Sequence, residues 1–304
     1  MAFYLGIDGG GSKTTCTIGD DTSILGTGTS GASNFIRVGG EKTRQALAAA
    51  VQDACADAKI SPDQIERTCI GLAGAARAEV RDWVQRAASE LVSGEIEIVG
   101  DNITALHAAF GAGPGVVVIA GTGSIAFGRN SRGDTARAGG WGFAVSDEGS
   151  GHWIGRAAVS AALRAEDAAD SVALMGNILQ AWNLSSRDVL VMAANATPSP
   201  DFATLVPVVI QSSESGDRAA TDVLTRAGTQ LAGIAAIVLR RILTDEPAQV
   251  AMSGGVFRHS SLVRETFYNR LEILSPGIRI RPEIVDPVQG ALELARAGIR
   301  NRQP

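Results

Sequence analysis

A run of three glycines between two strand-like segments constrains the fold of this chain more than any other feature. Residues 4–7 are apolar and predict a buried strand, which is broken at Asp8-Gly9-Gly10-Gly11-Ser12-Lys13-Thr14. β-branched residues resume at 14–18, so the sequence predicts a strand, a glycine turn and a returning strand. A hairpin turn needs only one or two glycines, so the third suggests a turn shaped around a ligand.

The residues of this turn favour an anion as the ligand. Backbone N–H groups of glycines can turn toward an anion, and the side chains of Ser12, Lys13 and Thr14 add donors. The segment is not a P-loop, because the pattern G-x-x-x-x-G-K-[ST] is absent and a strand follows instead of a helix. The alternative at this point is an ordinary β-hairpin turn.

The same design occurs again about 110 residues later, which predicts two similar half-domains. An apolar strand at 116–120 leads into Gly121-Thr122-Gly123-Ser124 and then into a second strand at 125–129. Small donors on such a turn suit a second phosphate contact, and a plain turn is the alternative.

Apolar runs that end in glycine alternate with Ala-rich helical stretches, which predicts an α/β fold. Besides those already named, the expected strands are 67–72, 95–99 and 249–252, with extended pieces at 279–281 and 284–285. The expected helices are 41–59, 79–91, 105–110, 154–164, 172–182, 186–194, 202–213, 218–243 and 289–297. The expected domains are residues 1–110 with 286–304, and residues 111–285.

A carboxylate follows the predicted strand 95–99. Asp101 suits either the N-cap of the helix expected at 105–110 or a general base at the carboxyl edge of a sheet. The two roles can coexist at neighbouring residues, because Asn102 or Thr104 can also cap the helix.

Two further glycine-rich segments are suited to ligands. Trp141 lies between glycines at 139–142, a poor arrangement for a core residue because glycines lose more chain entropy than they return in packing. It is suited to form a wall for a sugar ring, with Asp147 accepting hydrogen bonds from the hydroxyls. The strand end Ser253-Gly254-Gly255 has no bulk and can admit a flat ring such as adenine.

Charge and composition exclude several kinds of partner. The chain has 27 Lys and Arg against 32 Asp and Glu, a net charge of -5 and no basic cluster, which argues against nucleic acid. Apolar runs such as 116–120 are too short to span a bilayer, and the N-terminus lacks a signal-peptide pattern. Cys16, Cys55 and Cys69 are scattered, as expected for free thiols in a reducing compartment. The sequence therefore predicts a cytoplasmic protein with no membrane partner.

In this order the segments resemble the actin-like ATPase superfamily, and within it the N-acetylglucosamine kinase and BadF/BadG/BcrA/BcrD ATPase family. The segments that carry the resemblance span the whole chain and are 5–14, 33–34, 100–101, 120–124, 139–142, 146–151, 253–255 and 286–291. The resemblance implies two actin-like (ribonuclease H-like) α/β domains with an interdomain cleft, which close over Mg²⁺, ATP and an amino sugar. Kinases of this likeness are often dimers, so a homodimer is expected.

The resemblance also implies roles for individual residues. Asp8 would position the magnesium and phosphate group, and Asp101 would be the catalytic base. The implied ATP-binding residues besides Asp8 are Gly10, Gly11, Ser12, Lys13, Thr14, Gly121, Thr122, Gly123, Ser124, Gly254 and Gly255. The implied sugar-binding residues are Asn34, Asp101, Thr122, Gly140, Trp141 and Asp147.

The implied reaction is phosphorylation of the 6-hydroxyl of N-acetylglucosamine by ATP. Ala73 stands where some N-acetylglucosamine kinases have a serine, so one sugar contact is missing. The alternatives are a glucosamine or broad-specificity hexose kinase, an ATPase that activates a partner enzyme, and a sensor without turnover. Three scattered cysteines offer no evident set for the iron–sulfur cluster that such activators carry, and a sensor does not need a base at Asp101.

Overall fold

The computed structural model describes residues 2–170, 173–242 and 249–298. By its internal contacts the chain divides into unit 1, Met1–Val117 with Val285–Pro304, and unit 2, Val118–Ile284. The domain boundaries expected from the sequence stay a prediction, and Met1 and residues 299–304 of the expected first domain lie outside the described residues.

Unit 1 is built on a five-stranded sheet with the order β3-β2-β1-β4-β5. Its strands are β1 (Phe3–Gly9), β2 (Thr14–Gly19), β3 (Ile24–Ser30), β4 (Ile65–Leu72) and β5 (Glu95–Val99). β1 and β2 form the antiparallel pair that the glycine turn predicts, whereas β1, β4 and β5 run parallel. The carboxyl ends of these three strands therefore lie on one edge of the sheet.

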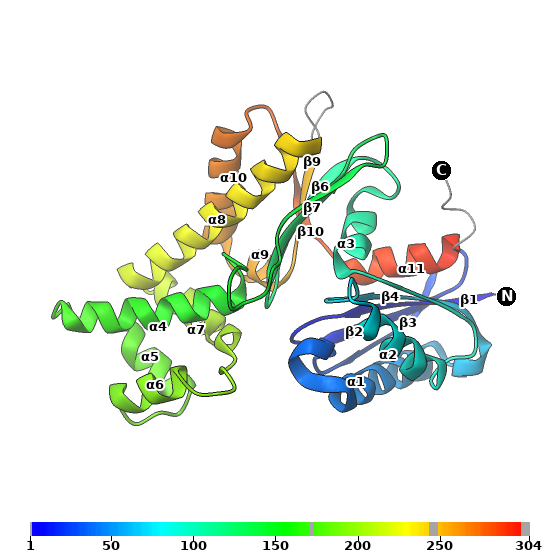
Figure 1. The fold of residues 1–304 in the computed structure, drawn as a ribbon, viewed down its shortest axis with the longest axis horizontal. Coiled ribbons are helices and arrows are strands. Elements are labelled where there is room, and N and C mark those ends of the chain that lie inside the picture. The colour runs from blue at the N-terminus through cyan, green and yellow to red at the C-terminus, as the bar shows by residue number, and fades with distance from the viewer. Residues whose placement is uncertain (1, 171–172, 243–248, 299–304) are drawn as a thin grey trace. The chain divides into compact units, whose positions relative to one another are not determined.

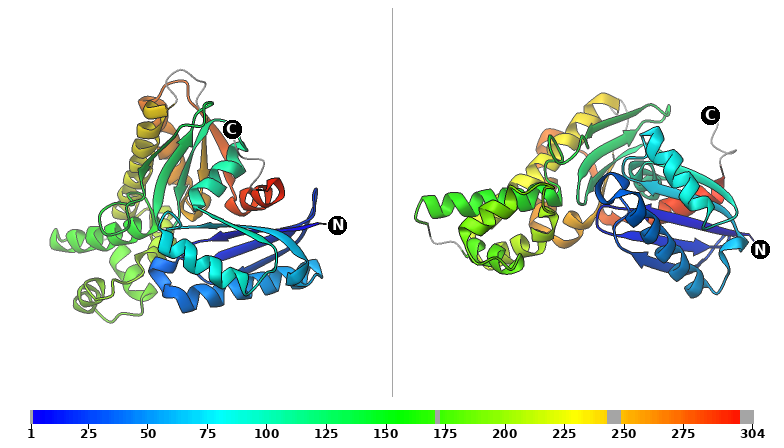
Figure 2. Two further views of the ribbon diagram at one scale, coloured as in Figure 1. Left: turned by 45° about the vertical axis from the view of Figure 1, so that its right-hand side comes forward. Right: turned by 60° about the horizontal axis from the view of Figure 1, so that its bottom comes forward.

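Helices cover both faces of this sheet. They are α1 (Phe35–Ala58), the 3₁₀ turn η1 (Pro62–Gln64), α2 (Ala78–Ser89), α3 (Asp101–Phe110) and α11 (Pro287–Ala297). Leu5 and Ile7 of β1 join a core with α1 and α2, whereas Tyr4 packs with α11, because successive side chains of a strand point to opposite faces. Figure 1 and the left view of Figure 2 show α1 and α2 on one side of the strands and α11 on the other.

The strand β3 was not expected from the sequence, because its glycines have low strand propensity. The structure explains them: a Cβ on Gly26 or Gly28 would collide with the backbone of α1. Helix α1 begins at Phe35 and not at Glu41, and its backbone is non-helical at Gly39, where φ is 78°. The prediction missed the first turn because this glycine interrupts the helical pattern.

Unit 2 repeats the strand connectivity of unit 1. Its sheet has the order β10-β9-β6-β7-β8, so the first strand is again central, followed outward on one side by the second and third strands. The strands are β6 (Gly115–Ala120), β7 (Ser124–Arg129), β8 (Thr135–Gly139), β9 (Gln249–Ser253) and β10 (Arg279–Val285). The predicted repeat and α/β class are confirmed, whereas β8 was not expected and the two extended pieces form the single strand β10.

The helices of unit 2 lie mostly between β8 and β9 along the chain, just as α1 lies between β3 and β4 in unit 1. They are α4 (Gly151–Asp167), α5 (Leu174–Ala181), α6 (Arg187–Ala194), η2 (Phe202–Leu205), α7 (Val206–Glu214), α8 (Arg218–Ile242), α9 (Gly255–His259) and α10 (Ser261–Leu274). The single helix expected at 202–213 is a 3₁₀ turn followed by α7, which has proline in its first turn. The last two helices were not expected, and the ends predicted at 172 and 243 lie outside the described residues.

Within the described residues, α8 is the one helix long and apolar enough to cross a membrane. The apolar window of this helix has a mean hydropathy of 1.2 and is 56% buried. Its side chains pack against β7, β8, α4, α7 and α10. A core helix of this length passes the same test, so the match is weak evidence for a membrane span.

Candidate functional site

Three carboxylates lie at the carboxyl edge of the unit 1 sheet, near enough that the charges of two act on the third. Asp8 is the second-last residue of β1, Asp101 is the first residue of α3, and Asp286 immediately precedes α11. Helix α11 lies directly on β1, because a Cβ on Gly6 would come within 2.8 Å of the carbonyl oxygen of Val288. No role was predicted for Asp286 from the sequence, although the proline that follows a short extended piece marks a helix start there.

The pKa values of two of these carboxyl groups are shifted upward. Burial, followed by the negative charges of Asp101 and Asp286, raises the pKa of Asp8 from 3.8 to about 7, against the lowering effect of Lys13. Burial also raises the pKa of Asp101, although the backbone N–H of Asn102 donates to its Oδ1 at 2.9 Å and lowers it. A carboxylate with a raised pKa is the stronger proton acceptor.

The capping alternative for Asp101 is wrong. The helix begins at Asp101 and not at Ala105, and the N-cap is Gly100, which has no side chain to accept a hydrogen bond. The hydroxyl of Thr104 donates to the carbonyl oxygen of Asp101 at 2.9 Å, so it does not cap the helix either. In the first turn the carboxylate is still favoured by the helix dipole.

The glycine turn of unit 1 has its carbonyl groups bound to the rest of the unit. The backbone N–H groups of Ser33 and Asn34 donate to the carbonyl oxygen of Gly10 at 3.1 and 3.2 Å. The guanidinium of Arg37 donates to the carbonyl oxygen of Gly11 at 3.3 Å. The negative ends of these peptide dipoles therefore face the protein, which is the orientation that an anion-binding turn requires.

Thr14 links the end of the turn to the segment that precedes α1. It is fully buried at the start of β2, and its hydroxyl lies 2.8 Å from the carbonyl oxygen of Gly31 and 2.7 Å from the hydroxyl of Ser33. The remaining predicted phosphate-binding residues, Ser12 and Lys13, lie exposed in the turn.

Asn34 has an unusual position at the start of α1. It occupies the N-cap, yet its side chain makes no capping hydrogen bond. Its Oδ1 is buried and, among the described residues, has no hydrogen-bond partner. Leaving a buried acceptor unpaired costs about 1–3 kcal/mol. The amide is therefore suited to accept a hydrogen bond from a ligand.

Backbone contacts bring three predicted segments of unit 2 to one end of its sheet. The carbonyl oxygens of Gly121 and Thr122 accept hydrogen bonds from the first two N–H groups of α4, at 2.8 and 3.2 Å. A Cβ on Gly254, where φ is 100°, would collide with the carbonyl group of Ala120. Beside Gly121, in contrast, no described atom lies within 4 Å of the place of a Cβ.

Asp147 links the loop after β8 to this turn. Its side chain is buried, its φ is 66°, and its Oδ1 accepts a hydrogen bond from the backbone N–H of Gly142 at 3.3 Å. A Cβ on Gly123 would come within 2.9 Å of the Asp147 carboxylate. Burial raises the pKa of Asp147, whereas the bond from Gly142 lowers it.

Trp141 presents its ring to solvent. Its side chain is 70% exposed, and glycines with positive φ flank it at positions 140 and 142. The guanidinium carbon of Arg137 lies 3.8 Å from the centre of the ring. Two residues on, the ring of Phe143 packs against the buried ring of His152, tilted by 43° with 4.7 Å between ring centres. An exposed aromatic face held by such a loop is suited to a sugar ring.

The donor set fits one kind of metal ion. Among the residues that the structure describes, no three His, Cys, Asp or Glu side chains are close enough to hold a metal. Mg²⁺ is usually bound by one or two carboxylates together with phosphates and water, and not by a cage of protein ligands. Asp8, beside a turn suited to phosphate, fits this pattern.

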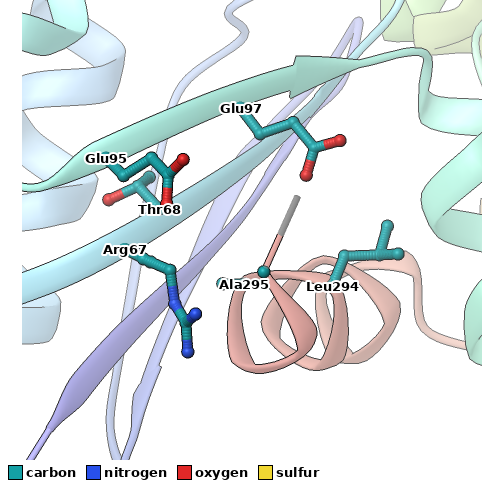
Figure 3. A pocket seen from close by; sticks show the side chains of 7 residues that line it. Arg67, Thr68, Glu95, Glu97, Leu294 and Ala295 are labelled. Atoms are coloured by element: carbon teal, nitrogen blue, oxygen red, sulfur yellow. The ribbon is translucent and has the colours of Figure 1, made fainter. Parts of the chain in front are cut away.

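A hollow at the opposite edge of the unit 1 sheet does not belong to the site. Figure 3 shows Arg67 and Glu95, from the amino ends of β4 and β5, beside Ala295 of α11. The cavity volume is about 10 Å³, the lower limit for one water molecule. The hollow is therefore too small for a substrate.

Comparisons with known proteins match the chain over most of its length. The sequence model of the BadF/BadG/BcrA/BcrD ATPase family matches residues 5–295. An N-acetylmuramic acid/N-acetylglucosamine kinase of Clostridium acetobutylicum is 31% identical, over 98% of this chain and 99% of the relative. An N-acetyl-D-glucosamine kinase of Dictyostelium discoideum is 28% identical, over 96% and 97%.

A solved structure shows the same fold. It is that of a candidate N-acetylglucosamine kinase from Chromobacterium violaceum, which is 27% identical and has a TM-score of 0.77. The alignment covers 96% of this chain and 98% of the other. The expected fold class is confirmed.

Proposed function

This chain belongs to the BadF/BadG/BcrA/BcrD ATPase family, and on this premise we propose that it phosphorylates the 6-hydroxyl of N-acetylglucosamine with ATP. Its nearly full-length similarity to curated amino-sugar kinases makes it an ATP-dependent sugar kinase that acts on amino sugars. The hydroxyl that is phosphorylated and the preferred amino sugar belong to the proposal.

The observation that carries the proposal is the arrangement of Asp101 with Asp8. Both lie at the carboxyl edge of the unit 1 sheet, beside the glycine turn, and the pKa of each is raised. In this proposal, Asp101 accepts the proton of the sugar hydroxyl as its oxygen attacks the γ-phosphate. Phosphoryl transfer needs little more from a protein than alignment, charge neutralisation and such a base.

The proposed nucleotide contacts are divided between the two units. In unit 1, Asp8 would hold Mg²⁺ and the turn would contact phosphates through Gly10, Gly11, Ser12 and Lys13. Thr14, also predicted as a phosphate contact, is fully buried with its hydroxyl bonded within the unit, so in this structure it supports the turn instead. In unit 2, the proposed contacts are Gly121, Thr122, Gly123 and Ser124 for phosphate and Gly254 and Gly255 for adenosine. The bound metal ion would neutralise charge on the transferring phosphate. The open space beside Gly121 supports a close approach of a phosphate to this turn.

For the sugar, we propose Asn34 and Asp101 in unit 1 and Thr122, Gly140, Trp141 and Asp147 in unit 2. The unpaired Oδ1 of Asn34 and the exposed ring of Trp141 support these assignments. Asp147 would accept hydrogen bonds from hydroxyls, as carboxylates commonly do. A cytoplasmic location and a homodimer complete the proposal.

The test is ADP release with a panel of acceptors: N-acetylglucosamine, glucosamine, N-acetylmannosamine, glucose and N-acetylmuramic acid. The proposal predicts release that depends on sugar and is fastest with an N-acetylated hexosamine. Fastest release with glucosamine or glucose would move the assignment to the free amine or to a broad hexose kinase. No sugar-stimulated release would overturn it in favour of an activator or a sensor.

A further inference from the structure

Arg137 has a position that the proposed reaction does not use. It lies on β8, and its guanidinium lies over the ring of Trp141, with 3.8 Å between the guanidinium carbon and the ring centre. The two other cation–π contacts among the described residues are longer, at 4.9 and 5.3 Å. The guanidinium of Arg137 therefore lies directly over the ring that we propose as the wall of the sugar site.

No residue that the structure describes neutralises the charge of this guanidinium. Within residues 2–170, 173–242 and 249–298, the side chain of Arg137 makes no ion pair and no hydrogen bond. Arg132, in the turn that precedes β8, is instead paired with Asp134 at 3.1 Å. An unpaired, partly buried cation beside a binding surface is suited to an anion from a ligand.

Stacking leaves the guanidinium able to bind such an anion. A guanidinium over an aromatic ring characteristically stacks with one face on it, which leaves its five N–H donors in the plane, pointing outward from its edge. A carboxylate matches two of these donors and forms a bidentate pair. The ring of Trp141 thus offers a surface for a sugar ring, and the guanidinium of Arg137 beside it offers donors for an anion.

The loop next to this wall cannot bind an acidic sugar by itself. Residues 139–151 include Asp147 and Glu148 and contain no Lys or Arg. A carboxylate on the sugar would be repelled by these acids unless a cation is close. Arg137 supplies that cation from the strand that precedes the loop.

We infer that Arg137 is a specificity residue that lets the enzyme accept amino sugars with a carboxylate-bearing ether substituent. The inference rests on the proposed function, because Trp141 contacts the sugar only in that proposal. The carboxylate pairs with the edge of the guanidinium while the sugar ring lies on the wall formed by Trp141. N-acetylmuramic acid and N-acetylglucosamine are a matched pair of probes, because they differ by such an ether.

The experiment measures kcat/KM for both sugars in the wild-type protein, Arg137→Gln and Arg137→Lys, with Arg132→Gln as the matched control. Arg137→Gln should lower kcat/KM for N-acetylmuramic acid by about tenfold or more, since a hydrogen bond to a charged group is lost. The value for N-acetylglucosamine should change less than about threefold. Arg137→Lys should be intermediate, because lysine keeps the charge without the planar fork, and Arg132→Gln should match the wild type.

Three results would overturn the inference. They are an equal loss for both sugars, a rise in the KM for ATP that matches the loss, and a wild-type enzyme that phosphorylates only the neutral sugar. If no sugar stimulates turnover, the proposed function fails, and calorimetric titration with N-acetylmuramic acid then decides the inference. If the wild type binds N-acetylmuramic acid and Arg137→Gln does not, the inference is supported. If the wild type does not bind it, the inference is refuted.

Discussion

The two glycine turns, one in each unit, occupy the same place in sheets of the same strand order but differ in charge. The turn of unit 1 is flanked by Asp8 and Lys13, whereas the turn of unit 2 lies between Ala120 and Ser124 and has no charged residue. In this account the charged turn holds the metal ion through Asp8, and the neutral turn offers only backbone and hydroxyl groups. One backbone design thus serves two kinds of chemistry.

The shared part of the design is how each turn is anchored. In both units, the carbonyl oxygens of the turn accept hydrogen bonds from backbone N–H groups. These donors lie at the start of the helix that follows the third strand, or just before it. The donors are Ser33 and Asn34 before α1, and Gly151 and His152 at the start of α4. Sheets with the same strand order therefore hold their turns through the same kind of backbone hydrogen bond, whereas the side chains around each turn determine its chemistry.

The largest expected effect comes from comparing an acidic residue of unit 1, Asp101, with one of unit 2, Asp147. Asp101→Asn should lower kcat by about 100-fold or more, because the variant lacks the proton acceptor, while ATP affinity barely changes. Asp147→Asn, the matched change in unit 2, should act mainly on the KM for the sugar. Steady-state kinetics with both substrates varied will check both. Near-wild-type turnover by Asp101→Asn would remove this residue from the role of base.

Glycine replacements compare two positions within unit 2. Gly254→Ala should destabilise the protein by about 1–3 kcal/mol, because φ is 100° and a Cβ would collide with Ala120. Gly121→Ala should leave stability unchanged and raise the KM for ATP, because its Cβ would extend into open space. Denaturant unfolding and ATP kinetics measure the two effects. Equal destabilisation by both changes would contradict the comparison.

The loop of unit 2 should affect one substrate selectively. Trp141→Ala should raise the KM for the sugar about tenfold, equivalent to about 1.4 kcal/mol, and the KM for ATP far less. The reason is that the exposed ring contacts the acceptor and not the nucleotide in this account. Comparable increases for both substrates would indicate a general folding defect.

The smallest expected effect concerns the charge of the unit 1 turn. The pKa of Asp8 is raised to about 7 in the folded protein, so Asp8 destabilises the fold as the pH rises from about 4 through 7. Asp8→Asn cannot ionise, and it should therefore melt a few degrees higher than the wild type at about pH 8. At about pH 4 the two proteins should melt alike. Thermal melts without nucleotide measure this, and no pH dependence of the difference would contradict the shift.

The sequence predicted those parts of the fold that local patterns determine. The two strand–turn–strand units, the α/β class and the closing helix follow from apolar runs and glycines. The strand β3 could not be predicted, because Gly26 and Gly28 serve a close contact with α1 that only the folded chain shows. The start of α3 was placed at Ala105, because Gly100 as N-cap gives no side-chain signal.

The sequence identified individual candidate residues for the site, but it did not show which of them lie together in the folded chain. Asp286 is 185 residues from Asp101 along the chain, and only the packing of α11 on β1 brings it to the edge where Asp8 lies. The buried, unpaired Oδ1 of Asn34 is also a property of the folded unit. The roles assigned to the site residues stay predictions until kinetics and ligand complexes test them.

Identification of the product tests the central claim most directly. The protein is incubated with ATP, Mg²⁺ and N-acetylglucosamine, and the product is examined by phosphorus–proton correlation NMR. We expect a phosphate coupled to the protons on carbon 6, and we expect it to be absent when Asp101→Asn replaces the wild type for the same time. A phosphate coupled to the proton on carbon 1, or no phosphorylated sugar from the wild type, would contradict it.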